Sequence, residues 1–89
     1  MDISRCAAAG TMESSDAYVE IEPSQNGLDI ELSSVVQNQF GEKIEAVIKE
    51  VLEEQGIENA NVRVIDKGAL ECVIRARVET AILRGKGEF

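Results

Sequence analysis

The longest regular pattern in this 89-residue chain is that of an amphipathic helix, which runs from about residue 34 to residue 56. Hydrophobic residues recur there at intervals of three and four, and charged residues fill the positions between them. Ser34 is placed to cap its start, and Gly56 to end it in a left-handed conformation. A helix with one apolar face needs a second layer to bury that face, so the rest of the chain must supply one. The apolar positions are Val36, Phe40, Ile44, Val47, Ile48, Val51 and Leu52.

Two segments before this helix alternate between apolar and polar residues, which is the period of a half-buried strand. The first, Ala17 to Ile21, ends at Pro23, and the second begins at Leu28 after an Asn-Gly turn signal. This turn predicts that the two strands pair antiparallel. A third segment, Arg5 to Met12, is apolar enough for a short strand, although Ala and Gly favour strands poorly.

The half of the chain that follows the helix predicts one more strand and one more helix. Residues Asn61 to Ile65 alternate again and end at an Asp-Lys-Gly turn. The segment Ala69 to Arg84 fits both a long strand and a helical stripe, and its length and the helix stop at Gly85 favour the helix. The expected order is (β)ββ-α-β-α, an α+β fold in which two amphipathic helices cover one side of a small antiparallel-containing sheet. We expect one domain, residues 1–84, and a flexible tail, residues 85–89.

The charge of the chain narrows the class of its partners. Seventeen acidic residues against nine basic ones give a net charge of −8, which repels nucleic acid and anionic membranes alike. No apolar run approaches the length of about 20 residues that spans a membrane, and the N-terminus lacks the pattern of a secretory signal. We therefore expect a cytoplasmic protein that binds neither nucleic acid nor membrane.

The usual catalytic groups are scarce. The chain has no histidine, which removes the commonest general base and metal ligand. Cys6 and Cys72 lack the spacing of a zinc site, and two cysteines form no disulfide framework. A chain this short builds a deep catalytic cleft with difficulty. The sequence therefore favours a carrier, adaptor or subunit over a complete enzyme.

One polar segment, "AGTMESSD" at residues 9–16, places two adjacent serines between two carboxylates. If Arg5 to Met12 is a strand, the serines lie at the exposed tip of a hairpin on a rigid sheet. Serine and aspartate are also common in turns, where their side chains bond to the backbone, so a polar turn without chemistry is the alternative.

Several segments, taken together, resemble the acyl carrier subunit, or gamma chain, of citrate lyase. They are "AGTMESSD", "IEP" after the following strand, "VVQNQFGEKI" at the helix start and "VRVIDKGALECVIRARVETAILR" near the end, in the same order and spacing. The resemblance implies a non-catalytic carrier subunit without a metal. In that family a serine of the first motif bears 2'-(5''-phosphoribosyl)-3'-dephospho-coenzyme A through a phosphodiester. The motif assigns this attachment to Ser14, with Ser15, where the family often has glycine, as the alternative.

The resemblance also implies partners and a reaction. A prosthetic-group transferase attaches the arm, whose thiol carries acetyl and citryl thioesters between the alpha (transferase) and beta (lyase) subunits while citrate is cleaved to acetate and oxaloacetate. The carrier of malonate decarboxylase, which uses the same type of group, and an unmodified acidic adaptor are the alternatives. Arg75 and Arg77 are within reach of the arm's phosphates in this interpretation, although a solvated helix face is the simpler reading of both.

Overall fold

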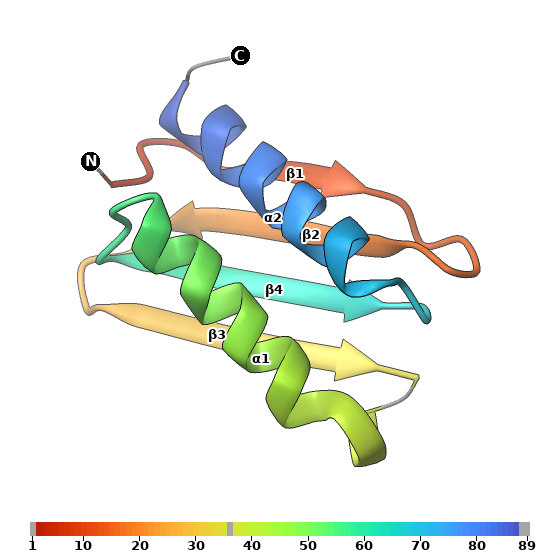
Figure 1. Cartoon of the computed structure of the whole chain (residues 1–89). Coiled ribbons are helices and arrows are strands. Elements are labelled where there is room, and N and C mark those ends of the chain that lie inside the picture. Colours follow the sequence, from red (N-terminus) through yellow and green to blue (C-terminus); the bar gives the residue numbers. More distant parts are fainter. Residues whose placement is uncertain (1, 36, 88–89) are drawn as a thin grey trace.

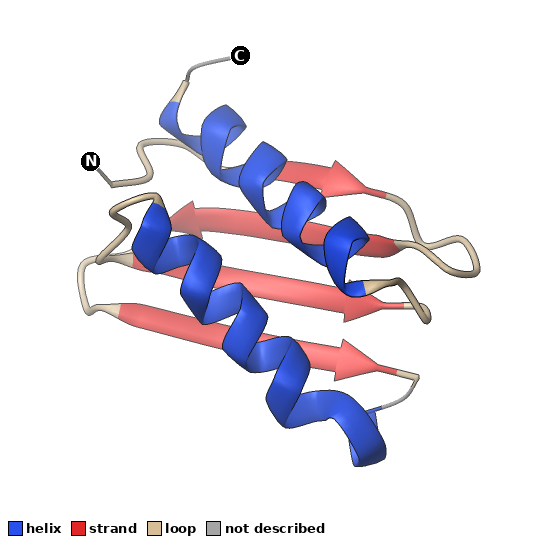
Figure 2. Cartoon of the chain, in the orientation of Figure 1, coloured by secondary structure: helices blue, strands red, loops and turns tan. Residues whose placement is uncertain are grey.

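The structure, a computed structural model, describes residues 2–35 and 37–87 of the chain. One four-stranded sheet carries two helices, and both helices lie across the same face of it (Figures 1 and 2). The predicted α+β order, β-β-β-α-β-α, is confirmed. The elements are β1 (Ala7–Gly10), β2 (Ala17–Pro23), β3 (Leu28–Ser34), α1 (Gln37–Glu54), β4 (Ala60–Asp66) and α2 (Glu71–Lys86).

The strands lie in the order β1-β2-β4-β3 across the sheet. The hairpin of β1 and β2 is antiparallel, as expected. The predicted pairing of β2 with β3 is wrong, because β4 lies between them, antiparallel to β2 and parallel to β3. The burial of each strand gives the physical reason: β4 buries Ala60, Val62 and Val64, whereas no residue of β3 is fully buried. The more apolar strand occupies the centre of the sheet, where the helices cover it.

An aliphatic core fills the space between the sheet and the helices. Each of its largest side chains stabilises the fold by about 1.5–3 kcal/mol relative to the exposed side chain. The predicted core positions Val36 and Phe40 lie outside the described side chains. The largest fully buried apolar residues are Val19, Ile21, Ile48, Val51, Leu52, Val62, Val64, Ile74, Val78 and Ile82.

The start of α1 differs from the prediction. Ser34 is the last residue of β3, and α1 begins at Gln37. The hydroxyl of Ser34 donates a hydrogen bond of 2.8 Å to the carboxylate of Asp66 on β4. This bond joins the two parallel strands β3 and β4. The capping role of Ser34 stays a prediction, because residue 36 lies outside the described residues. The end of the helix agrees with the prediction, since Gly56 follows α1 with a φ of 70°.

The predicted helix stop at Gly85 is also wrong. Helix α2 continues to Lys86, and Gly87, with a φ of 81°, ends it. Gly85 is buried at a close approach of the helix to the rest of the fold, where an added Cβ would lie 3.1 Å from Ile3 and 3.2 Å from Ile21. Residues 88–89 of the expected tail lie outside the described residues. Neither helix in the described ranges is long and apolar enough to cross a membrane.

Candidate functional site

The two serines lie in the loop that joins β1 to β2, residues 11–16, which we call the serine loop (Figure 1). Both serines are exposed, as are the other residues from 11 to 15. The hairpin register ends with Gly10 opposite Tyr18, and the N–H of Thr11 donates to the carbonyl oxygen of Ala17 at 3.2 Å. The predicted hairpin tip is thus confirmed, and it presents both hydroxyls at one end of the sheet.

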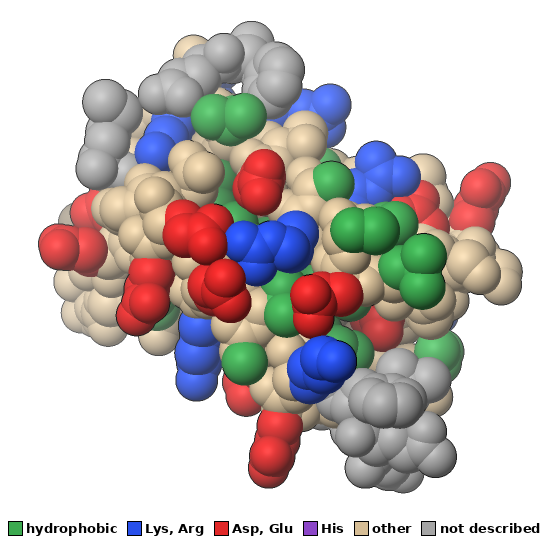
Figure 3. All heavy atoms as spheres, viewed as in Figure 1, with side chains coloured by type: hydrophobic (Ala, Val, Ile, Leu, Met, Phe, Trp, Pro, Cys, Tyr) green, Lys and Arg blue, Asp and Glu red, His purple; other side chains and the backbone are tan. Residues whose placement is uncertain are grey.

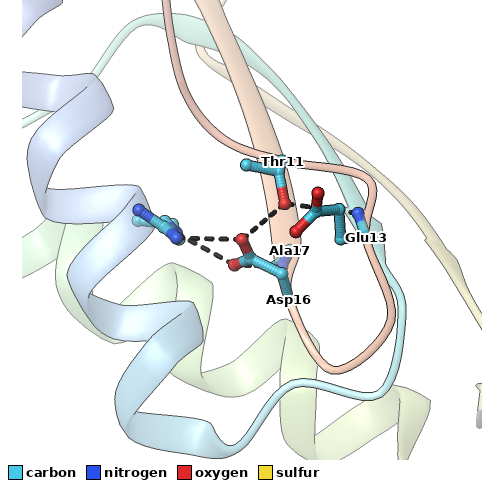
Figure 4. A network of polar contacts seen from close by, with 5 residues as sticks. Thr11, Glu13, Asp16 and Ala17 are labelled. Atoms are coloured by element: carbon cyan, nitrogen blue, oxygen red, sulfur yellow. Dashed lines mark hydrogen bonds and ion pairs between the residues drawn. The ribbon is translucent and has the colours of Figure 1, made fainter.

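Asp16 closes the serine loop. Its carboxylate accepts a hydrogen bond of 2.6 Å from the hydroxyl of Thr11 and one of 2.7 Å from the N–H of Ala17 (Figure 4). The hydroxyl oxygen of Thr11 accepts in turn from the N–H of Glu13 at 3.2 Å. One carboxylate therefore ties the first residue of the loop to the strand that follows it.

Arg77 of α2 reaches the same carboxylate. Its Nε lies 3.0 Å from Oδ1 of Asp16, and its Nη2 lies 2.9 Å from Oδ2, which is the bidentate arrangement of a strong charge-assisted pair. This pairing holds the pKa of Asp16 well below its ordinary value of 3.8, and the bonds from Thr11 and Ala17 lower that pKa further. The pKa of Arg77 is raised for the same reason. Asp16 is therefore ionised at neutral pH.

The link between β4 and α2 holds the other side of the loop. The N–H of Ser15 donates to the carbonyl oxygen of Lys67 at 2.8 Å, and the N–H of Lys67 donates to the carbonyl oxygen of Asp16 at 2.9 Å. Ser15 has a φ of 66°, a left-handed value that non-glycine residues adopt rarely. Among the described residues, the hydroxyl of Ser14 has no hydrogen-bond partner.

Asp66 fixes the link itself. Its side chain is buried, with 1% exposure, and its Oδ1 accepts from the N–H groups of Gly68 at 3.1 Å and Ala69 at 2.8 Å. Gly68 has a φ of 90°, so the predicted Asp-Lys-Gly turn is confirmed. Asp66 stabilises this turn and does not cap α2, whose N-cap residue is Leu70. This turn places the backbone of Lys67 against the serine loop.

The structure separates the two arginines that the sequence named together. Arg75 pairs with Glu54 at 2.9 Å and with Glu50 at 3.3 Å, so it joins α2 to α1. Figure 3 shows basic side chains set among acidic ones on this helix-bearing face. Arg77, in contrast, contacts the serine loop and does not belong to a purely solvated helix face. The sequence reading missed this contact.

The arrangement suits the presentation of a hydroxyl better than its activation. Both oxygens of Asp16 accept hydrogen bonds, two of them from a guanidinium, so this carboxylate is a poor general base for either serine. Cys6 and Cys72 are free and exposed. Within residues 2–35 and 37–87, no three Cys, Asp or Glu side chains gather as metal ligands would.

Known proteins share this sequence and this fold. The family model described as the malonate decarboxylase delta subunit (MdcD) matches residues 4–85. The citrate lyase acyl carrier protein of Haemophilus influenzae (strain PittEE) is 53% identical over 88 residues, which cover 99% of this chain and 92% of that protein. That of Klebsiella pneumoniae is 53% identical over 85 residues, which cover 94% of this chain and 88% of that protein.

A solved structure agrees with the sequence comparisons. One chain in the crystal structure of a Pseudomonas malonate decarboxylase hetero-tetramer in complex with malonate matches with a TM-score of 0.75 and 27% identity, over 86% of this chain and 79% of that chain. The likeness to the Haemophilus and Klebsiella proteins covers nearly the whole chain. The chain therefore belongs to the citrate lyase acyl carrier protein family.

Proposed function

We propose that this chain is the acyl carrier subunit of citrate lyase and that Ser14 bears 2'-(5''-phosphoribosyl)-3'-dephospho-coenzyme A through a phosphodiester. The observation that carries the proposal is the exposed hydroxyl of Ser14, without a hydrogen-bond partner among the described residues, at the tip of a loop whose base is fixed to the sheet and to α2. An enzyme that attaches the arm can reach such a hydroxyl without unfolding the carrier. When bound, the arm supplies a thiol that holds acetyl and citryl groups as thioesters.

The backbone at the two serines favours Ser14 over Ser15. Ser15 occupies a left-handed conformation, and its N–H is bonded to Lys67, so the fold requires a backbone geometry at this position and not a side chain. Glycine meets that requirement best, which gives a physical reason for the glycine that the family motif often has there. A hydroxyl that can be absent from a carrier is a poor candidate for the attachment point.

The proposal assigns no catalysis to this chain alone. The base that takes the proton of Ser14 during attachment belongs to the prosthetic-group transferase, because both oxygens of Asp16 are occupied. The alpha (transferase) and beta (lyase) subunits of citrate lyase then act on the acyl group. The exposed end of the hairpin lets one arm visit two such sites in turn. A cytoplasmic location, without nucleic-acid or membrane partners, accords with the charge of −8.

Intact mass spectrometry after coexpression with the prosthetic-group transferase tests the attachment. We expect the wild-type chain and Ser15→Gly to gain the mass of the arm, and Ser14→Ala to gain nothing. The Klebsiella pneumoniae relative, expressed in parallel, controls for transferase activity. An unmodified wild-type chain beside a modified control would overturn the proposal, and loss of the mass gain in Ser15→Gly alone would move the site to Ser15.

A second candidate, the carrier of malonate decarboxylase, is supported by the family model and by the hetero-tetramer that shares this fold. The identity of about half of all residues favours citrate lyase. Reconstitution separates the two candidates. We expect the modified, acetylated chain to restore the release of oxaloacetate from citrate when it is mixed with citrate lyase alpha and beta subunits. Restoration of malonate decarboxylation alone would favour the second candidate.

A further inference from the structure

The ion pair of Arg77 with Asp16 has no part in the attachment chemistry, yet it joins the serine loop to helix α2. We propose that Arg77 is a positioning residue for Ser14: through Asp16 it selects the loop conformation in which the transferase receives the Ser14 hydroxyl. This inference rests on the proposed function and names the part of the carrier that the transferase needs in place.

The serine loop has no apolar anchor that could shape it. Residues 11–15 are exposed, and Met12, the large apolar residue among them, is 55% exposed. The order of the loop therefore depends on its polar contacts. Of these contacts, the ion pair between Asp16 and Arg77 connects the loop to α2. The backbone hydrogen bonds of Lys67 connect it to the segment between β4 and α2.

Arg77 orients the two oxygens of Asp16. Oδ2 accepts hydrogen bonds from Nη2 of Arg77 and from the hydroxyl of Thr11. Oδ1 accepts hydrogen bonds from Nε of Arg77 and from the N–H of Ala17. A bidentate guanidinium fixes the plane of the carboxylate, so it directs one oxygen to the start of the loop and the other to its end. The geometry of Glu13, Ser14 and Ser15 between those ends follows from that orientation.

The aliphatic stem of Arg77 has a separate role. An added Cβ on Gly10 would lie 3.1 Å from Cδ of Arg77, so the stem packs over the last residue of β1. Arg77→Met keeps most of this stem and removes the guanidinium. The variant therefore tests the ion pair and leaves the packing in place.

Arg75 supplies a matched control. It lies on the same helix two residues earlier and its Nη2 makes hydrogen bonds of 2.9 and 3.0 Å to the carboxylate of Glu54, but its partners belong to α1. If Arg77 only stabilised the fold, the transferase would modify Arg75→Met and Arg77→Met with the same KM. A positioning role affects only Arg77→Met.

The experiment measures initial rates of modification by the transferase against the concentration of the intact carrier. If a substitution lowers the fraction of carrier molecules whose serine loop has the competent conformation, the apparent KM rises by the factor by which that fraction falls. The value of kcat is then unchanged. We expect Arg77→Met to raise KM about tenfold or more at constant kcat, Arg77→Lys to restore part of the loss, and Arg75→Met to stay within about twofold of wild type. Circular dichroism checks that each variant is folded.

Asp16→Asn separates positioning from direct contact with the transferase, because it breaks the pair and keeps Arg77. We expect the same rise in KM as in Arg77→Met. Wild-type KM in Asp16→Asn, or in both variants, would overturn the positioning role while the proposed function stands. A wild-type chain that the transferase never modifies would instead refute the proposed function itself.

Discussion

The aliphatic core and the serine loop are neighbours held in place by different forces. The core consists of side chains such as Ile48 and Leu52 on α1, which are fully buried against the sheet. The serine loop buries no large side chain and takes its shape from Asp16 and its hydrogen-bond partners. The difference teaches that stability and presentation of the serines are separable properties, which substitutions can change one at a time.

The largest effect on stability is expected from the core. Leu52→Ala removes a fully buried side chain and leaves a cavity, which lowers the free energy of unfolding by about 2–5 kcal/mol. Urea denaturation measures the loss. Leu70→Ala is the control, since Leu70 is 71% exposed and its truncation changes the free energy of unfolding by no more than about 0.5 kcal/mol. Similar losses in both variants would contradict the division between core and surface.

A smaller effect is expected where the sheet meets the serine loop. Gly10 has a φ of 95°, and an added Cβ would overlap the carbonyl oxygen of Ala17. Gly10→Ala should therefore lower the free energy of unfolding by more than the left-handed conformation alone costs, which is about 1–2 kcal/mol, because the overlap adds to that cost.

The matched control for this variant is Gly27→Ala. Gly27 has a φ of 90°, but no atom lies within 4 Å of an added Cβ. Its substitution costs only the left-handed conformation, about 1–2 kcal/mol. Thermal denaturation of the two variants compares them directly. A Gly27→Ala variant as unstable as Gly10→Ala would show that the overlap with Ala17 contributes nothing.

The smallest effect on the free energy of unfolding at neutral pH is expected from loss of the ion pair between Asp16 and Arg77, which orders the serine loop. Because the pKa of Asp16 is lowered in the folded protein, the stabilisation from its partners is fully present above its ordinary value of 3.8 and is lost as the pH falls from there towards the lowered pKa. We expect the carboxyl carbon of Asp16 to show no titration near pH 3.8 in an NMR experiment. In Arg77→Met, which removes the largest cause of the shift, the titration should move up towards that value.

If Asp16 of the wild-type chain titrated near its ordinary pKa of 3.8, the ion pair with Arg77 would not order the serine loop. The contrast between an apolar core and a loop held by charge would then be wrong. A titration that stays low in Arg77→Met would assign the shift to Thr11 and Ala17 instead. Each outcome identifies which partner orders the loop.

The sequence predicts the local structure well because that structure depends on periodicity. The two helices and the alternating strands β2, β3 and β4 follow from spacings of two and of three to four residues, whereas β1, and with it the hairpin that exposes Ser14, is expected from the apolar character of its residues alone. The pairing of strands is a long-range property, and the Asn-Gly signal next to β3 carried no information about β4. The neighbour of an edge strand is decided by which other strand buries more apolar surface.

Single residues with two possible uses account for the remaining differences. The sequence predicts Ser34 at the start of the first helix, but it is the last residue of β3, and its hydroxyl donates to Asp66 on the adjacent strand. Gly85 looks like a helix stop, yet it is needed where Ile3 packs against α2. The contact of Arg77 with Asp16 joins residues 61 positions apart, and no spacing rule connects such charges.

The central place of β4 has a consequence for the order of events during synthesis. The ribosome releases β2 and β3 before the strand that lies between them exists, so the nascent sheet has no centre until residue 66 has emerged. Lys67 and Arg77, which hold the serine loop, follow later still. A growing chain exposes its two serines before it can anchor them, and it acquires the anchored loop only after Arg77 has emerged.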